Sequence, residues 1–341
     1  MARPVTIAFD VMGGDHGPVE VVRGAAELSL TTPHIHALLV GDGNQIEEAL
    51  SKTRYNGERI AVHHAPDFVS MTEKPGEAIA KKPEASICVA ANLVVHGDAD
   101  ALVSAGNTGA GILACARYFN LLPGIRRAAL CAVYPTRQTR GQKQDPFALM
   151  LDVGATVDAT AEDLVAFAVM GSAYARIISK NERPVVALLS NGTEANKGPA
   201  RVVEAHERLR KADAVNFIGN VEGVDIPRGT ADVVVCDGFV GNVVLKMLEG
   251  VAETAVELAR NASKESLRLK AGLGLLAPGI EKLKTVVDWE QYGGAPVLGF
   301  DRIFIKAHGR SKARAISNAG KVAAKAVAND LCKQILEGLP K

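Results

Sequence analysis

Short apolar runs alternate with amphipathic stretches along the whole chain of 341 residues. Runs such as Val5–Asp10, Ala101–Ser104 and Val185–Leu189 have the length and apolar content of strands buried on both faces of a sheet. Between the runs, apolar residues recur at helical spacing, which is typical of helices that cover a sheet. The alternation predicts an α/β fold with three layers, α/β/α, around a largely parallel sheet.

The same patterns place the other elements, and we expect residues 1–341 to form one catalytic domain. Two polar segments interrupt the pattern: residues 71–82 have the composition of a mobile segment, and residues 137–145 are expected to form a hairpin loop. Further strands are predicted at residues 37–41, 60–64, 129–134, 148–153, 215–219, 233–236 and 302–306. Helices are predicted at residues 19–30, 83–96, 161–178 and 199–212, from about residue 243 onward, and, as one long helix, at residues 312–336.

Turns rich in glycine and polar residues follow several of these strands directly. They include residues 12–18 (MGGDHGP), 105–111 (AGNTGAG), 190–198 (SNGTEANKG) and 237–242 (DGFVGN). A strand, a glycine turn and a helix in succession aim backbone N–H groups at one spot, which suits an anion such as phosphate. The carboxyl ends of parallel strands share one sheet edge, so we expect these turns to form one cleft. An ordinary connection, with glycine for close packing, is the alternative for any single turn.

The chemical inventory of these turns favours binding and positioning over covalent catalysis. The sequence has no GxGxxG, Walker A, HExxH or GxSxG motif and no Cys/His metal spacing, so neither a metal nor a cofactor is expected. N–H donors, Asn, Thr and a few cations suit a site that holds an oxyanion and an acyl carbonyl while phosphate itself attacks. Lys197 is a candidate cation for that phosphate, with a solvated surface lysine as the alternative.

The amino-acid composition limits the cellular compartments and the classes of partner that are expected. The five cysteines are an odd number without a CxxC motif, which indicates a reduced, cytoplasmic protein without disulfides. The net charge of +1 and the aromatic content of 4% argue against nucleic-acid binding. No apolar run approaches the roughly 20 residues that a membrane-spanning helix needs.

Residues 243–288 are predicted to form a protruding helix–loop–helix. Its apolar tip lies at residues 273–280, and basic residues flank the tip on both sides. This combination is typical of a surface that contacts an anionic membrane peripherally. The alternatives are a contact between two subunits and a contact with an acidic protein partner. The residues proposed for membrane or carrier contact are Lys264, Arg268, Lys270, Leu273, Leu275, Leu276, Lys282 and Lys284.

A set of motifs spread over nearly the whole chain resembles one known family. The motifs are DVMGGDHGP (10–18), SAGNTGA (104–110), LDVGA (151–155), GTEANKG (192–198), GNVEG (219–223), DVVVCDGFVGNVVLK (232–246), YGGAPVLG (292–299) and KAHGRS (306–311). In order and content they resemble the bacterial phosphate acyltransferase (PlsX) family. The resemblance implies a fold related to phosphotransacetylases and to isocitrate- and isopropylmalate-dehydrogenase-like enzymes. It also implies transfer of a fatty acyl group from acyl-carrier protein to inorganic phosphate, which gives acyl phosphate for phospholipid synthesis.

The resemblance further implies partners and site residues. A homodimer that associates peripherally with the membrane is expected to pass acyl phosphate to a membrane glycerol-3-phosphate acyltransferase. The implied catalytic residues are Asn107, Lys197, Asn242 and His308. Phosphate and substrate binding are implied for Gly13, Gly14, Asp15, Gly106, Thr108, Asn220, Asp237, Gly238 and Gly241. Competing functions are a short-chain phosphotransacetylase that uses acyl-CoA, a non-catalytic acyl-binding regulator and a nicotinamide dehydrogenase of related fold.

Overall fold

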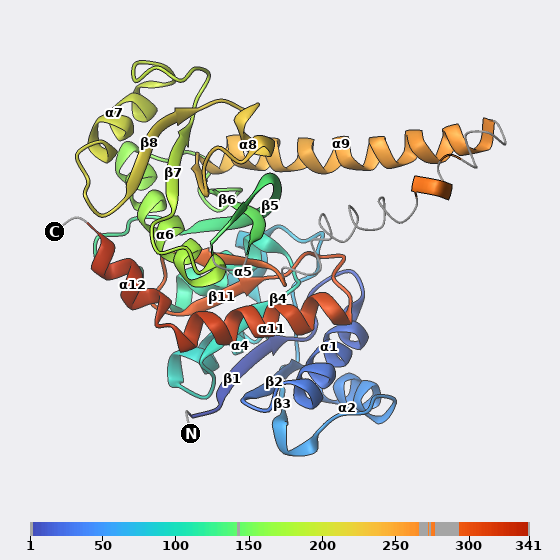
Figure 1. Ribbon diagram of the computed structural model, residues 1–341. Coiled ribbons are helices and arrows are strands. Elements are labelled where there is room, and N and C mark those ends of the chain that lie inside the picture. The colour runs from blue at the N-terminus through green and yellow to red at the C-terminus, as the bar shows by residue number, and fades with distance from the viewer. Residues whose placement is uncertain (1–2, 142–143, 266–271, 273, 277–292, 340–341) are drawn as a thin grey trace.

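One mixed sheet runs through the whole molecule (Figure 1). The computed structural model describes residues 3–141, 144–265, 272, 274–276 and 293–339. The sheet has 11 strands, and the α/β prediction is confirmed. In spatial order the strands are β3 (Ile60–His64), β2 (Ile35–Gly41), β1 (Val5–Asp10), β4 (Ala101–Ser104), β11 (Ile303–Lys306), β10 (Ala295–Leu298), β5 (Ala129–Arg140), β6 (Asp145–Leu151), β9 (Val233–Val235), β7 (Val185–Leu189) and β8 (Asn216–Val221).

The direction of the strands reverses in the middle of the sheet. Strand β10 is antiparallel to both of its neighbours, and β5 is antiparallel to β6. Strands β6, β9, β7 and β8 are parallel to one another and run in the opposite sense to β1, β4 and β11. The expectation that all the glycine turns share one edge is therefore wrong, because a hairpin and one antiparallel strand divide the strand ends into two groups.

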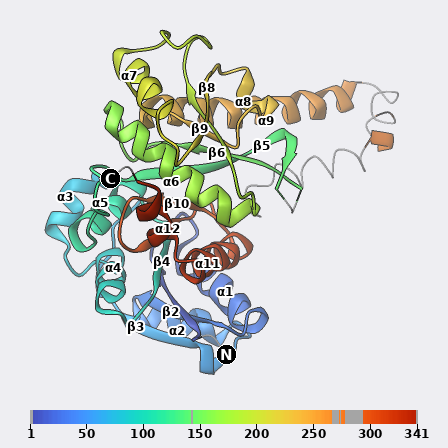
Figure 2. The same cartoon turned by 60° about the vertical axis from the view of Figure 1, so that its left-hand side comes forward.

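Helices cover both faces of the sheet, so the fold has three layers (Figure 2). One face carries α1 (Gly17–Thr31), α2 (Gly43–Ser51), α6 (Ala161–Ser179), α7 (Ala200–Leu209), α11 (Ala313–Ala328) and α12 (Leu331–Gly338). The other carries α3 (Pro75–Lys81), α4 (Ser86–His96), α5 (Thr108–Tyr118), α8 (Asp225–Arg228) and α9 (Gly238–Glu265). A short 3-10 turn, η1 (Gly57–Arg59), precedes β3.

Strand β1 shows how the sequence produces these layers. Its residues Ile7 and Phe9 pack with α1 and α11 in one core cluster, whereas Ala8, which lies between them in the chain, packs with α4 in another. Successive side chains of a strand point to opposite faces, so a continuous apolar run fills two cores at once.

The two polar segments have more regular structure than expected. Within residues 71–82, Pro75–Lys81 forms α3, because proline suits a first helical turn and both Ala78 and Ile79 are buried. Residues 137–145 do lie in a hairpin, as predicted, because β5 pairs antiparallel with β6. The strands are longer than expected: β5 continues to Arg140, whose guanidinium is buried and paired with Asp232. The polar character of this segment therefore does not mark the end of the strand.

Two further predictions need correction. The segment YGGAPVLG contains β10, which sequence reasoning did not predict; its Pro296 is opposite Ile305 in the pairing with β11. The predicted long helix over residues 312–336 is two helices, α11 and α12. They are separated by Asp330, whose φ of 47° interrupts the helical path.

Helix α9 spans the first part of the segment in which the helix–loop–helix is predicted. In both views it extends away from the sheet, and only its first turns pack against the core, through Val240, Val244, Leu245 and Leu248 (Figures 1 and 2). Of the residues proposed for membrane or carrier contact, Leu275 and Leu276 are described and exposed. Arg268, Lys270, Leu273, Lys282 and Lys284, and the side chain of Lys264, lie outside the described residues.

Candidate active site

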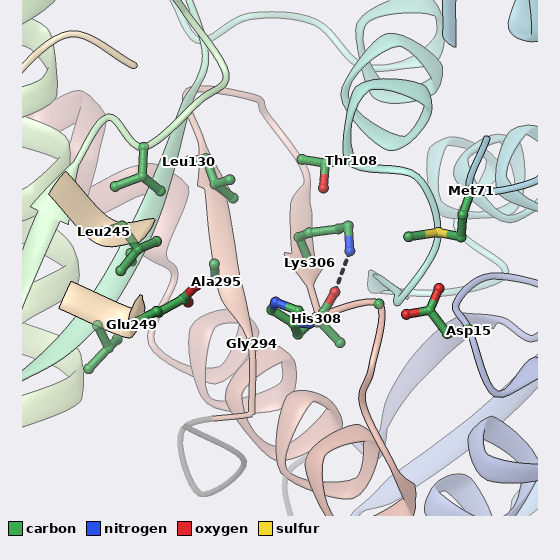
Figure 3. Close-up of a pocket in the computed structure, with 15 residues that line it drawn as sticks. Asp15, Met71, Thr108, Leu130, Leu245, Glu249, Gly294, Ala295, Lys306 and His308 are labelled. Atoms are coloured by element: carbon green, nitrogen blue, oxygen red, sulfur yellow. Dashed lines mark hydrogen bonds between the residues drawn. The ribbon is translucent and has the colours of Figure 1, made fainter. Parts of the chain in front are cut away.

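A cavity of about 350 Å³ lies among the strands β11, β10 and β5, the start of α5 and the first turns of α9 (Figure 3). We call it the central pocket. Its polar side chains come from four separate segments of the chain, whereas β5 and α9 supply an apolar wall. The lining residues are Asp15, Met71, Thr108, Leu130, Ala132, Val133, Val153, Leu245, Glu249, Gly294, Ala295, Lys306, Ala307, His308 and Gly309.

A buried carboxylate fixes the two glycine turns behind this pocket. Asp10, at the end of β1, accepts hydrogen bonds of 2.6 Å from both Ser86 and Ser104, and Ser104 Oγ accepts the backbone N–H of Gly106 at 3.0 Å. A Cβ atom on Gly13 would lie 2.6 Å from the nitrogen of Gly106, so glycine is required where the two turns touch. Burial raises the pKa of Asp10, while the two serine hydroxyls oppose that shift.

The turn that follows β1 also holds the loop that follows β11. Gly14 has a φ of 98°, a region that favours glycine, and the next N–H, that of Asp15, donates to the carbonyl of Gly309 at 2.8 Å. The structure therefore brings Gly13, Gly14, Asp15 and Gly106 together, as the sequence predicts.

Helix α5 points its N-terminus at the pocket. Thr108 is its first residue and lines the cavity, and the first N–H groups of a helix have no acceptor within the helix. Asn107 caps this helix by accepting the N–H of Ala110 at 3.1 Å. The Asn107 amide nitrogen donates to the carbonyls of Met71 and Glu73, so this side chain orients the pocket and holds the segment that carries Met71.

Lys306 is the buried cation of the central pocket, and sequence reasoning missed it. Only 6% of the residue is exposed, and its ammonium group donates to the carbonyl of Ala307 (Figure 3). Burial lowers the pKa of Lys306 to about 8, although Asp10 and Asp15 favour its charged form. The available signal was its place in KAHGRS, directly at the end of a strand beside the predicted His308.

His308 lies at the rim of the pocket, between Lys306 and the Glu249 side of α9 (Figure 3). The backbone N–H of Arg310 donates to its Nδ1 at 3.3 Å, which leaves Nε2 to carry the proton of the neutral ring. Partial burial, followed by the positive charge of Arg310, lowers the pKa of His308. A neutral His308 is therefore a hydrogen-bond donor at pH 7 rather than a cation.

The opposite wall is apolar. Leu130 on β5 and Leu245 on α9 lie across the cavity from Asp15 and Met71, with Lys306 and His308 between the two sides (Figure 3). This division gives the pocket one end suited to a charged group and one end suited to hydrocarbon.

The start of α9 packs tightly against the turn that follows β6. Asn242 Nδ2 donates to the carbonyl of Val153 at 3.0 Å, and Val153 lines the central pocket. A Cβ atom on Gly238 would lie 2.6 Å from Asp152 Oδ2, and Gly241 is closer still to the backbone of Asp152. Asn242, Gly238 and Gly241 therefore shape the apolar wall from behind.

The remaining predicted residues belong to a second region. A separate cavity of about 600 Å³, which we call the distal pocket, is lined by Leu189, Ser190, Asn191, Gly198, Pro199, Arg201, Val202, Cys236, Asp237 and Val240. It shares no lining residue with the central pocket. Lys197 is exposed on the loop beside it, and Asn220 is buried between His206, which it contacts at 2.9 Å, and the carbonyl of Glu194.

The cysteines do not offer a nucleophile in the described part of the chain. Cys88, Cys115, Cys131 and Cys236 are buried and Cys332 partly so, and all five are free thiols. Burial raises the pKa of Cys236, at the edge of the distal pocket, well above its usual range. A neutral, buried thiol is a poor nucleophile.

Two properties of the described residues bear on other classes of site. No group of three or more His, Cys, Asp and Glu side chains there is arranged to hold a metal ion. None of the helices in the described ranges is both long and apolar enough to cross a membrane.

Comparison with known proteins decides the family. The family model described as fatty acid synthesis protein matches residues 5–334. A phosphate acyltransferase from Dictyoglomus turgidum is 44% identical over 336 residues, 98% of each chain. One from Desulfitobacterium hafniense is 43% identical, over 98% of this chain and 97% of the relative. The chain belongs to this phosphate acyltransferase family. The predicted family is confirmed, and with it the assignment as an acyltransferase enzyme of fatty acid and phospholipid synthesis.

Solved structures support the predicted fold relationship. A phosphotransacetylase from Streptococcus pyogenes superposes with a TM-score of 0.64 at 17% identity, over 95% of this chain and 94% of the other. A 4-hydroxythreonine-4-phosphate dehydrogenase from Klebsiella pneumoniae gives 0.52 at 15% identity, over 96% and 100%. At these identities the likeness shows a common fold alone, so the reaction in this family has to be argued from its own pocket.

Proposed function

We propose that the central pocket is where this acyltransferase joins inorganic phosphate to a fatty acyl group from acyl-carrier protein. The observation that supports this most directly is the division of the cavity. Lys306, Thr108 and the N-terminus of α5 form a cationic and donor-rich end, and Leu130, Val153 and Leu245 form an apolar wall. Acyl phosphate has the same division between a charged head and a hydrocarbon chain.

The polar end holds phosphate. Lys306 supplies a positive charge with little water around it, so its attraction for an anion is stronger than at the surface. The Thr108 hydroxyl and the first N–H groups of α5 supply neutral donors. Asn107 and the Asp10 network keep these groups in place before the substrate binds.

The reaction is then a direct displacement. A phosphate oxygen attacks the thioester carbonyl carbon, a new C–O bond forms, and the carbonyl oxygen becomes an oxyanion that the Nε2–H of His308 can stabilise. The C–S bond breaks as the carbonyl re-forms. Lys306, whose pKa of about 8 lies near that of an ordinary thiol, gives its proton to the leaving sulfur and recovers one from the hydroxyl of phosphate. Phosphate and thioester thus become acyl phosphate and free thiol, with protons balanced.

The exposed face of α9 supports the two proposed associations. Phe239, Val243, Met247 and Val251 recur every four residues and are more than half exposed, which is typical of a helix face that a partner covers. We assign this face to a second copy of the chain. The exposed Leu275 and Leu276, further along the same protrusion, are assigned to peripheral contact with an anionic membrane, where acyl phosphate passes to a glycerol-3-phosphate acyltransferase.

One assay tests the reaction and its donor. The full chain is mixed with inorganic phosphate and either long-chain acyl-carrier protein or a short acyl-CoA, and acyl phosphate is trapped as hydroxamate. We expect product from the carrier-bound thioester, and loss of most turnover in Lys306→Gln. Product from short acyl-CoA alone would replace the proposal with the phosphotransacetylase alternative. Full activity in Lys306→Gln would remove the reaction from the central pocket.

A further inference from the structure

The distal pocket has polar groups that the protein itself does not satisfy. Ser190 Oγ and Arg201 Nε are both buried, and neither has a hydrogen-bond partner among the described residues. Both side chains line the cavity. Buried donors without partners are rare in folded proteins because each forfeits its hydration, so two in one cavity indicate a ligand that supplies acceptors.

The charged side chains that line this cavity are one arginine and one aspartate. Asp237, only 6% exposed, accepts one arm of the Arg201 guanidinium at 2.7 Å and the N–H of Val240 at 2.8 Å. The carboxylate therefore fixes the guanidinium and leaves Nε unused. An arginine held in this way presents its planar fork to phosphate oxygens, and Lys197 on the adjoining loop adds an exposed positive charge. Helix α7 begins beside it at Ala200.

The rest of the lining is aliphatic. Leu189, Pro199, Val202 and Val240 surround the polar groups, and no aromatic side chain among the described residues lines the cavity. A nucleotide base would find no ring to stack on, whereas a short branched hydrocarbon attached to phosphate would fit both parts of the lining.

We propose that the distal pocket binds a phosphate group attached to a short branched aliphatic segment, as found in the phosphopantetheine arm of a carrier-bound thioester. This assignment rests on one part of the proposed function, namely that the acyl donor is bound to acyl-carrier protein. Val240 lines the distal pocket, and Leu245 lines the central pocket. Both residues lie on α9, where five residues correspond to about 7.5 Å along the helix axis. The two cavities thus flank one helix, and a ligand anchored in the first is close to the second.

Direct binding tests the proposal without turnover. Titration calorimetry on the full chain uses three probes: 4′-phosphopantetheine, pantetheine without its phosphate, and inorganic phosphate. We expect 4′-phosphopantetheine to bind at least about tenfold more tightly than pantetheine, since hydrogen bonds to a charged group are worth that much. Ser190→Ala, which removes a single hydroxyl, and Arg201→Gln should each reduce this ratio several-fold. Lys211→Gln, an exposed lysine just beyond α7, is the matched control and should leave the ratio unchanged.

The outcomes separate this site from the central pocket. A ratio of one in the unmodified protein, or a ratio insensitive to both Ser190→Ala and Arg201→Gln, would overturn the proposal. Tight binding of inorganic phosphate that depends on Arg201, without a preference for 4′-phosphopantetheine, would overturn the assignment to the donor arm. Lys306→Gln should lose turnover and keep the ratio, so a failure of the reaction scheme cannot be mistaken for a failure of this site. In turnover, Arg201→Gln should raise the KM for acyl-carrier protein about tenfold.

Discussion

The glycine turns after β1 and β4 differ from the turn after β7 in how far the protein has already used their polar groups. In the first pair, Asp10, Ser86, Ser104 and the N–H of Gly106 satisfy one another in a closed, buried network. Beside the turn after β7, Ser190 and Arg201 each keep a buried atom without a hydrogen-bond partner among the described residues. The same pattern of strand, glycine and helix therefore produces a preorganised scaffold in one place and an unsatisfied binding surface in the other.

The largest expected effect comes from removing Lys306, the buried cation whose charged form Asp10 of the closed network favours. Lys306→Gln should lower kcat by about 100- to 1000-fold, which is the usual cost of one preorganised donor at a developing charge. Steady-state hydroxamate assays with acyl-carrier protein measure it, and the exposed Lys321→Gln on α11 is the control. A loss confined to KM would instead place Lys306 in ground-state binding alone.

The dependence of kcat on pH in the unmodified enzyme should reflect the titration of Lys306. The pKa of Lys306 is lowered to about 8, so the charged form is lost as pH rises through that value. We expect kcat to fall about tenfold per pH unit well above pH 8. Lys306→Arg, which stays charged, should remove this limb even if its plateau is lower. A limb that persists in Lys306→Arg must belong to another group.

Asp10 should act through Lys306 rather than on the substrate. Its negative charge favours the ammonium form, so Asp10→Asn should lower the pKa of Lys306 further and move the alkaline limb to lower pH. The side chain also satisfies Ser86 and Ser104, and Asp10→Ala should therefore cost about 1–3 kcal/mol in the free energy of unfolding. Urea denaturation measures the second effect. An unshifted limb in a folded Asp10→Asn protein would contradict the positioning role.

Sequence alone predicted the strand-and-helix alternation and the family, and it identified one of the two regions well. Gly13, Gly14, Asp15, Gly106 and Thr108 do meet, because each follows a parallel strand on the same side of the reversal in the sheet. Lys197, Asn220 and Asp237 lie in the other region, because β10 and the β5–β6 hairpin reverse the strand direction between them. The hairpin was expected, but the antiparallel pairing of β10 with the distant β5 leaves no local signal in the chain, so this division could not be predicted from spacing.

Lys306 was missed for a related reason. Lysines are mostly exposed, and no local pattern distinguishes a buried one. Its burial depends on two other segments, one that carries Asp10 and Asp15 and one that carries Thr108, which converge only in the folded sheet. Lys197 is the reverse case: a lysine in a glycine-rich turn that suggested phosphate binding, and that the structure places on an exposed loop.

The smallest expected effect is therefore at Lys197. Because its charge is exposed and next to the distal pocket, solvent and salt screen it, and Lys197→Ala should raise the KM for acyl-carrier protein no more than about threefold at physiological ionic strength. The effect should grow at low salt, where screening is weaker. Lys197→Arg should restore the original KM, since a rim cation needs charge rather than a particular geometry. If Lys197→Ala instead lowers kcat by 100-fold or more, a magnitude expected only for a group at the reacting atoms, then the loop after β7 reaches the thioester and the two regions form one site during turnover.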